Sequence, residues 1–256
     1  FGYLPATAEA ILRRWVRRES ALEWWPQVRL AAVERKGDRL TALEVISQGM
    51  AWRLQPTLVV DGSDRGDLFP LADVPFRLGW ESRERWGEPS APSQADLEAD
   101  PFYAAQPVQS PTWVVMAQLQ TPVPPTTETP AAPFSEATRR FGLERTLTYG
   151  RLPGGAVMLN WPLAGNDWHW GLARAFLPEG PPGQVPADLA ADMQGHSRAF
   201  ADALMAISGG CLQRATLFPS PGEAAAGALG GDQDWALMPY WREGRRLEAL
   251  ATVFEQ

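Results

Sequence analysis

The sequence is poor in the residues that form disulfides and metal sites. Its 256 residues include one cysteine and two histidines. A single cysteine excludes an intramolecular disulfide, and the two histidines lie far from it in the sequence, so we expect no structural zinc or other metal site. Cys211 has no basic neighbour in the sequence, which favours an unreactive buried thiol. Because nothing calls for an oxidising compartment, we expect a cytoplasmic location.

Long apolar stretches and an excess of positive charge are also missing. No run of 18 apolar residues occurs, so no transmembrane helix is expected, and no signal peptide is recognisable. The net charge of −7 argues against a nucleic-acid surface, which would need a basic stripe. Acidic residues interrupt the basic run at residues 13–18, so we interpret it as the solvated face of a helix. We therefore expect neither a membrane nor a nucleic acid as a partner.

The chain lacks the short motifs that cradle phosphates or activate a serine. It has no G-x-G-x-x-G after a strand, no G-x-x-x-x-G-K-[ST] and no G-x-S-x-G. These absences exclude a P-loop, a dinucleotide-binding turn and the nucleophile elbow of a serine hydrolase within these residues.

What the first part of the chain contains is a mixture of helical and strand patterns. Apolar residues at positions 8, 11, 12 and 15 predict a helix over 7–20 with one buried stripe. Residues 28–47 predict two strands around a turn at 36–38. The apolar run at 58–60 has no polar alternation, so we predict a strand buried on both faces, as in a parallel sheet.

The second part predicts an antiparallel sheet and a long helix. Strand-like runs at 112–119, 145–152 and 155–161 predict a partly separate antiparallel sheet. A helix is predicted over 187–208, because apolar residues recur at helical spacing and two glycines end the pattern. His196 lies on the apolar stripe of this helix, which favours a packed histidine. Together the patterns predict a mixed α/β fold with α+β character.

Three segments resemble motifs of a family of FAD-dependent oxidoreductases with the two-dinucleotide-binding architecture, and their order along the chain also agrees. The first covers residues 58–82 and keeps Asp61, Gly66, Asp67, Pro75, Arg77, Gly79 and Glu81. It has Gly-Ser-Asp at 62–64 where the family tends to have Ala-Thr-Glu. The second segment is "VMLNWPLAGNDWHWGL", and the third is "PYWREGRRLEALATV".

The resemblance implies that FAD is the cofactor of the complete protein, and that hydride or electrons pass between a small organic substrate and the flavin. Family members begin with a Gly-rich turn that cradles the FAD pyrophosphate. We expect that module upstream of Phe1 and a flavin-contacting segment beyond Gln256, on the same chain or on a companion chain. The present chain would then be a central fragment that holds FAD weakly or not at all when alone.

The resemblance also implies three consecutive parts. Residues 1–87 would be the remaining part of the FAD-binding domain, including the buried strand. Residues 88–133 would form Pro-rich loops and a connecting strand. Residues 134–256 would form a substrate-domain-like region with an antiparallel sheet and helices.

Candidates for the cofactor side lie in the first and third segments. Residues 61–63 end the predicted buried strand, where open α/β sheets place ligands. Positive charge near the flavin ring would stabilise its reduced, anionic form, so we assign catalytic roles to Arg242 and Arg245, on one helical face or one tight turn. A salt-bridged surface helix is the alternative for these arginines. The cofactor-binding candidates are Asp61, Gly62, Ser63, Gly66, Asp67 and Arg246.

The candidate for proton exchange lies in the second segment, in the stretch "GNDWHWG" at residues 165–171. His169 is the only histidine in this Trp-rich setting, and an imidazole can exchange a proton as hydride moves, so it is our third catalytic candidate. The alternative is a loop whose Trp168 and Trp170 plug the core while Asn166 and Asp167 form a turn. The substrate-binding candidates are Asn160, Trp161, Asn166, Asp167 and Trp168.

Two other classes of function remain open. The twelve tryptophans are compatible with a module that binds carbohydrates or aromatic ligands, although the helix predicted over 187–208 argues against a lectin-like β-sandwich. The chain could also be a non-catalytic remnant of a flavoprotein that keeps the fold and binds a partner chain.

Overall fold

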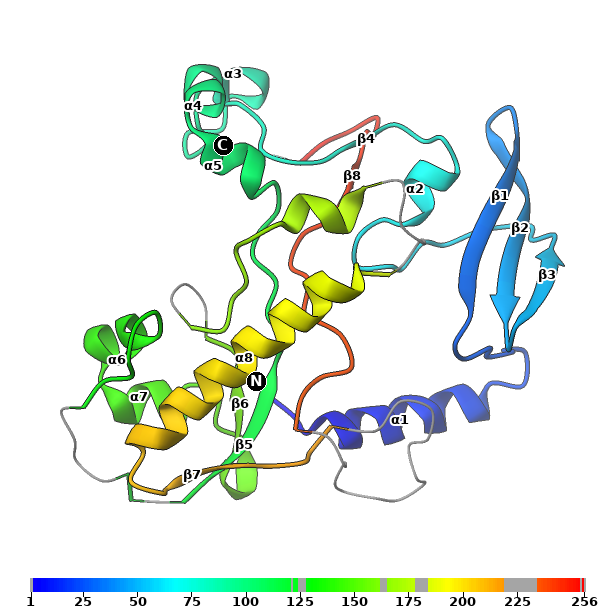
Figure 1. The fold of residues 1–256 in the computed structure, drawn as a ribbon. Helices are drawn as coiled ribbons and strands as arrows, with labels where there is room; N and C mark the ends of the chain where they lie inside the picture. The colour runs from blue at the N-terminus through cyan, green and yellow to red at the C-terminus, as the bar shows by residue number, and fades with distance from the viewer. Residues whose placement is uncertain are drawn as a thin grey trace. The chain divides into compact units, whose positions relative to one another are not determined.

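The computed structural model describes residues 2–120, 122–123, 128–161, 165–177, 184–218, 234–253 and 255 (Figure 1). It divides into two compact units, each built from three segments that are distant in the sequence. Unit 1 comprises Phe1–Trp24, Pro111–Trp168 and Ala191–Tyr240, and unit 2 comprises Trp25–Ser110, His169–Ala190 and Trp241–Gln256. Both units contain helices and antiparallel sheets, which confirms the predicted mixed α/β fold with α+β character. The three consecutive parts expected from the sequence stay a prediction.

Unit 1 contains a three-stranded antiparallel sheet with the strand order β6-β5-β7. Side chains of β5 alternate between the two faces of the sheet, as the pleat requires. Val115 packs in one buried cluster with Phe200, and Met116 packs in a second cluster with Leu152. Both faces of the sheet are therefore buried, and Figure 1 shows the long helix α8 lying across these strands. The bounds are β5 (Val115–Leu119), β6 (Ala156–Leu159), β7 (Leu212–Arg214) and α8 (Ala187–Ile207).

Helix α8 confirms the helix predicted over 187–208. The ring centroid of His196 lies 5.1 Å from that of Phe134 and 5.5 Å from that of Trp168. Its Nε2 lies 3.1 Å from the carbonyl oxygen of Gly165. These contacts confirm the interpretation of His196 as a packed histidine. Cys211 follows the helix and is a buried free thiol, as predicted.

The strand predicted over 145–152 is wrong. Residues in this region form helix α7 (Leu143–Thr148), and the third strand of the sheet is β7. Leu143 and Leu147 are buried one helical turn apart. Thr146 donates its hydroxyl hydrogen to a backbone carbonyl one turn earlier, which satisfies that group within the helix. The sequence pattern misled because threonine and tyrosine favour strands in general.

Helix α1 (Pro5–Arg18) confirms the first predicted helix but not its buried stripe. Pro5 occupies the first turn, where the missing N–H of proline has no helical partner to lose. Leu12 and Trp15 are 56% and 59% exposed, and Ala6 is the buried residue of the helix. Apolar spacing predicts which side chains share a face, whereas burial depends on what packs against that face. Among the described residues, little packs against the apolar face of α1, so this face is largely exposed to solvent.

Unit 2 contains a three-stranded antiparallel sheet in sequential order, β1-β2-β3. Its first two strands confirm the pair predicted over 28–47. Gly37 joins them with φ +59°, a backbone conformation that glycine adopts easily. The bounds are β1 (Arg29–Lys36), β2 (Arg39–Ser47) and β3 (Met50–Leu54).

A two-stranded sheet and several short helices complete the fold. In unit 2, β4 (Phe76–Arg77) pairs antiparallel with β8 (Arg246–Leu247), so that Arg77 lies opposite Arg246. The remaining described elements are α2 (Leu68–Leu71), α3 (Arg83–Trp86), α4 (Gln94–Ala99), α5 (Pro101–Ala105), α6 (Ser135–Phe141), η1 (Pro153–Gly155) and η2 (Leu172–Phe176).

The buried strand predicted at residues 58–60 is wrong. The segment has no regular structure, and Leu58 and Val60 are 80% and 83% exposed. A strand forms only where a neighbouring strand supplies the other half of its hydrogen bonds. No described residue pairs with this segment. The apolar run therefore has strand-forming residues but lacks a neighbouring strand.

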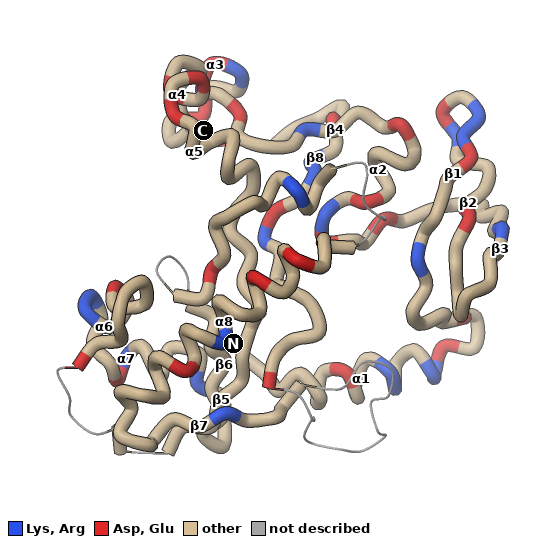
Figure 2. Tube along the Cα trace, viewed as in Figure 1, with Lys and Arg blue, Asp and Glu red and all other residues tan. Residues whose placement is uncertain are grey.

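Charged residues of both signs are interspersed along the described chain (Figure 2). On α1, Arg13 pairs with Glu9 at 2.7 Å, one helical turn away. In the described part of the chain, no helix is both long and apolar enough to span a membrane.

Candidate functional site

The loop that follows residues 58–60 is held by its own side chains. Asp61 accepts hydrogen bonds from the backbone N–H groups of Ser63 and Leu68, at 2.9 and 3.2 Å. Ser63 Oγ accepts a hydrogen bond from the N–H of Asp67 at 2.9 Å. Asp and Ser are typical of such turns because their short side chains reach nearby backbone groups. Asp61 and Ser63 therefore shape the loop that leads into α2.

A cavity of about 590 Å³ lies beside this loop within unit 2. Its size and its mainly apolar lining are typical of small-molecule and cofactor sites. A Cβ built on Gly62, in the same loop, would meet no atom within 4 Å, so a larger side chain has room there. The apolar lining residues are Val28, Leu30, Leu43, Val45, Val59, Val60 and Leu68, and the polar ones are Gln27, Arg29, Asp61, Ser63, Asp67 and Gln184.

Asp67 shares its carboxylate between two buried guanidinium groups. Arg245 Nη1 donates to Asp67 Oδ1 at 3.3 Å, and Arg65 Nη2 lies 3.5 Å from the same oxygen. The side chains of Arg65 and Arg245 are 4% and 6% exposed. Burial lowers the pKa of Arg245 and the charge of Asp67 opposes that shift, but arginine titrates so high that it stays protonated.

Backbone groups complete this buried cluster. Arg245 Nη2 donates to the carbonyl oxygen of Phe176 at 3.0 Å, and Arg65 Nη1 donates to that of Ala175 at 2.8 Å. Gly66 lies between Arg65 and Asp67 in the sequence and has φ +65°. A Cβ at this position would lie 2.9 Å from the ring of Phe69. The cluster therefore needs glycine at this position, which explains why the loop carries one.

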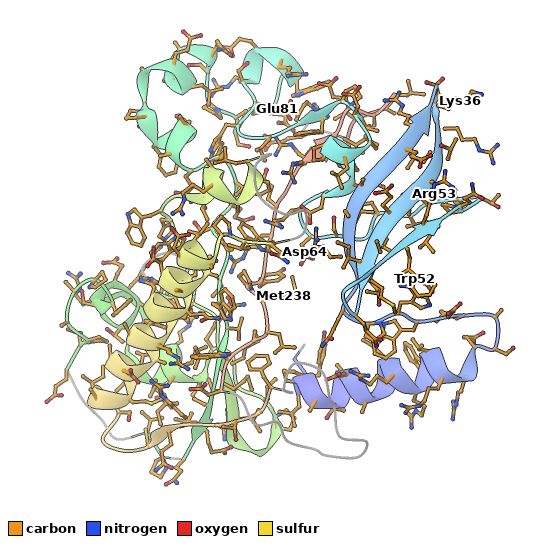
Figure 3. The ribbon with its side chains drawn as sticks, turned by 45° about the vertical axis from the view of Figure 1, so that its right-hand side comes forward. Lys36, Trp52, Arg53, Asp64, Glu81 and Met238 are labelled. Carbon is orange, nitrogen blue, oxygen red and sulfur yellow. The ribbon has the colours of Figure 1, made fainter. Side chains whose placement is uncertain are left out.

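Glu81 joins the first motif to the third in the same way. Arg77 Nη1 donates to Glu81 Oε1 at 2.9 Å, and Arg246 Nε lies 3.5 Å from Oε2 (Glu81 is labelled in Figure 3, as is Asp64 of the loop). Burial acts to raise the pKa of Glu81. Hydrogen bonds from Trp86 and Arg77 and the nearby positive charges outweigh it and hold the pKa below its usual value.

The three arginines of the third motif do not lie on one helical face or in one tight turn, as the sequence suggested. They lie in a non-helical segment that bends at Arg242 and ends in β8. Arg245 binds Asp67, Arg246 binds Glu81, Glu243 and the carbonyl oxygen of Gly79, and Arg242 donates to the carbonyl oxygen of Ser110. Their proposed electrostatic effect on a flavin stays a prediction.

His169 is hydrogen-bonded to a serine that the sequence did not single out. Ser110 Oγ lies 2.8 Å from His169 Nδ1, and Gln106 Nε2 donates to the same oxygen at 2.6 Å. Ser110 is 5% exposed, whereas His169 is half-buried. No motif contains Gln106 or Ser110, and their partner is more than fifty residues away, so no sequence signal could have revealed them.

The substrate-binding candidates that precede His169 belong to unit 1. Asn166 is 1% exposed, and its amide accepts from the N–H of Trp161 and donates to the carbonyl oxygens of Leu159 and Trp113. Buried Asp167 accepts the hydroxyl hydrogen of Thr112. Asn166 and Asp167 therefore hold the loop together.

The aromatic members of that set differ in exposure. Trp161 is buried, Asn160 and Trp168 are half-buried, and Trp168 packs against His196. Trp170 belongs to unit 2, is 55% exposed and packs edge-to-face against His169. Trp168 thus fits the predicted core plug and Trp170 does not. Roles in substrate binding stay predictions for the whole set.

Among the described residues, no group of three or more His, Cys, Asp and Glu side chains could hold a metal ion.

Comparison with known protein families gives a match over residues 2–256 to the family described as FAD dependent oxidoreductase. The chain belongs to this family. Comparisons with curated proteins and with solved structures find no match. Membership confirms the resemblance to FAD-dependent oxidoreductases, a family of flavoproteins that use FAD.

The cavity of this oxidoreductase chain fits only part of FAD. Apolar walls suit a flat ring system, and Asp61 and Ser63 in the lining offer oxygen atoms to hydroxyl groups. A diphosphate needs N–H donors or cations. The N–H groups of Asp67 and Leu68 are already bound by Ser63 and Asp61, and Arg29 is the one cation among the described lining residues. The described residues thus fit the ring and sugar portion but not the diphosphate.

Proposed function

We propose that this chain forms part of an enzyme that transfers hydride or electrons between a small organic substrate and FAD, with His169 in contact with the substrate. The flavin supplies the redox chemistry when it is bound, and the protein positions it and excludes water. One observation carries the proposal. In a chain of this family, a half-buried histidine is held through Nδ1 by a buried serine.

On the cofactor side, we propose that the loop at residues 61–63 lines the flavin or its sugar chain. Gly66, Asp67 and Arg246 hold this loop and the neighbouring β4–β8 sheet in place through the ion pairs described above. Arg245 fixes Asp67, and Arg242 fixes the backbone of Ser110. In this proposal the arginines act mainly by positioning the loops, and their positive charge adds to the field around the flavin.

We propose a small molecule as the substrate, with no nucleic acid or membrane partner, and a cytoplasmic location. The pyrophosphate-binding module would come from the same polypeptide or from a companion chain. A non-catalytic remnant of the family would keep the ion pairs of unit 2 but would not need His169. A substitution at this residue therefore separates the enzyme from the remnant.

The test is His169→Asn in the full-length, flavin-loaded protein. Asparagine keeps a polar group of similar reach but loses the imidazole. We expect FAD to stay bound and the rate of flavin reduction by substrate, measured by stopped flow and normalised to bound flavin, to fall by roughly 100-fold.

The matched control is His196→Asn, which removes the packed histidine of α8. We expect it to lower the melting temperature without slowing flavin reduction in the molecules that stay folded. Equal reduction rates in wild type and His169→Asn would refute a substrate-facing role for His169.

A further inference from the structure

The contact between Ser110 and His169 is one step of a short chain of hydrogen bonds with a defined direction. An amide N–H can only donate, so Gln106 Nε2 occupies a lone pair of Ser110 Oγ. Ser110 is 5% exposed, and its described hydrogen-bond partners are the Gln106 amide and the His169 ring. The oxygen keeps a second lone pair, but His169 Nδ1 is the one acceptor among its described partners, so the buried hydroxyl hydrogen is satisfied when it points at Nδ1.

We propose that Gln106 and Ser110 are positioning residues that hold neutral His169 in the tautomer with its proton on Nε2. A nitrogen that accepts the serine hydroxyl carries no proton, and in a neutral imidazole the other nitrogen must then carry it. This inference rests on the proposed function, and it makes His169 a hydrogen-bond donor to the substrate rather than a base acting through Nε2.

The backbone around the two positioning residues is anchored on both sides. Trp80 Nε1 donates to the carbonyl oxygen of Gln106 at 2.8 Å. The carbonyl oxygen of Ser110 accepts a hydrogen bond from Arg242, and the N–H of Gln109 donates to Glu243 at 2.9 Å. Arg242 and Glu243 of the third family motif thus anchor the backbone of the loop that carries Gln106 and Ser110.

The same facts exclude a nucleophilic role for Ser110. A nucleophilic serine must present its oxygen to the substrate. Ser110 is almost completely buried, and Gln106 already binds its oxygen. Ser110 therefore acts through His169. A donor at Nε2 selects substrates with an acceptor oxygen near the reacting carbon, such as a carbonyl or a carboxylate.

The discriminating variant is Gln106→Glu, which has nearly the same shape but offers an acceptor instead of a donor. A carboxylate at this position accepts the hydroxyl hydrogen of Ser110, whose oxygen then accepts a hydrogen bond from Nδ1–H. We expect the neutral tautomer of His169 to change from Nε2–H to Nδ1–H. Because free histidine also prefers Nε2–H, this reversal is more informative than the wild-type state.

The measurement is ¹⁵N NMR of the full-length, flavin-loaded protein with selectively labelled histidine, at a pH where the ring is neutral. His169 is assigned by the loss of its signals in His169→Gln. His196 is the internal reference, because its Nε2 faces a carbonyl oxygen that can only accept. Gln109→Glu is the matched control, since it adds the same charge to an exposed side chain of the same loop, and we expect no change of tautomer.

Ser110→Ala is a second variant, which removes the donor itself. We expect His169 to populate both neutral tautomers in it. Wild-type protein with Nδ1–H, or a tautomer that is the same in wild type, Gln106→Glu and Ser110→Ala, would overturn the inference.

The rate of flavin reduction separates this inference from the proposed function. If both hold, Gln106→Glu reverses the tautomer and slows reduction by on the order of 100-fold, while Gln109→Glu does neither. A reversed tautomer with an unchanged rate supports the positioning role and refutes the contact of His169 with substrate. A slowed rate without a change of tautomer refutes the positioning role.

Discussion

Glu81 is a mostly buried carboxylate that we expect to stabilise the folded protein through its ion pairs with two arginines. Its side chain is 17% exposed and lies between Arg77 and Arg246, which come from the two strands of the β4–β8 sheet. Removing one member of such a cluster leaves opposite charges partly buried without compensation. We therefore expect Glu81 to stabilise the folded protein only while it is ionised.

The prediction concerns Glu81→Gln and its dependence on pH. The folded-state pKa of Glu81 is lowered, so its stabilisation is present above the unfolded pKa of about 4.3 and is lost as pH falls through the folded pKa. Near neutral pH we expect Glu81→Gln to lower the free energy of unfolding by about 1–3 kcal/mol, measured by urea denaturation.

The difference between wild type and Glu81→Gln should shrink as pH falls below about 4. Glu248→Gln is the control, because Glu248 is half-exposed and lies 3.9 Å from Arg85, a separation at which we expect a change of less than about 1 kcal/mol. A loss for Glu81→Gln that is the same at neutral and acidic pH would assign its effect to packing rather than to charge.

At the residue scale, the motifs in the sequence contain residues that form ion pairs in the structure, but the sequence does not reveal which residue pairs with which. The resemblance singled out Asp67, Glu81 and two of the arginines, and the structure pairs them with each other. Asp67 and Arg245 are 178 residues apart, and no local pattern encodes such a contact. Ser110 belongs to no motif, so only the folded chain places it beside His169.

The loop at residues 61–67 contains two glycines, of which only Gly66 occupies a position where a larger residue would be strained. Gly66 has φ +65° and lies against the ring of Phe69, whereas Gly62 has open space around it. Substitution at Gly66 should therefore affect the fold. Substitution at Gly62 should leave the fold intact. In the proposed function a larger side chain there should hinder binding of the flavin.

The prediction compares Gly62→Leu with Gly66→Ala in the full-length protein. We expect Gly62→Leu to keep the melting temperature of the apoprotein and to lower the ratio of bound flavin to protein, measured by absorbance. Gly66→Ala should lower the free energy of unfolding by about 1–2 kcal/mol or more, because alanine is strained in the left-handed region. Full flavin occupancy in Gly62→Leu would place the cofactor away from this loop.

Elements with local signals were predicted well, and elements that depend on a partner were not. Helix α8 carries its own apolar spacing and its terminating glycines, and the β1–β2 hairpin carries its own turn. The run at 58–60 has strand-forming residues but no described neighbouring strand, and the strand-like region at 145–152 became α7 because leucines one turn apart are buried. In both cases tertiary contacts decided the structure.

At the scale of the whole molecule, each unit is assembled from three distant segments. Unit 2 brings the first and third family motifs together through the β4–β8 sheet and its ion pairs. Changes in composition along a sequence indicate linkers, but they do not indicate which distant segments contact each other. Domain bounds predicted from the sequence therefore cannot reveal a unit that is assembled from three separate segments. The first and third motifs contain the residues of the proposed cofactor side.

The last prediction concerns FAD binding by the 256-residue chain alone. The cavity beside residues 61–63 suits a ring system, but the N–H groups of Asp67 and Leu68 are already bound to side chains. Phosphate contacts supply much of the anchoring in dinucleotide sites. We therefore expect FAD to bind with a dissociation constant well above about 1 μM and to be lost on gel filtration. Riboflavin, which lacks the diphosphate, should bind within about tenfold of FAD in a fluorescence titration. A yellow, stoichiometric flavoprotein, or FAD binding far tighter than riboflavin, would mean that this chain carries diphosphate donors of its own and would contradict the fit described here.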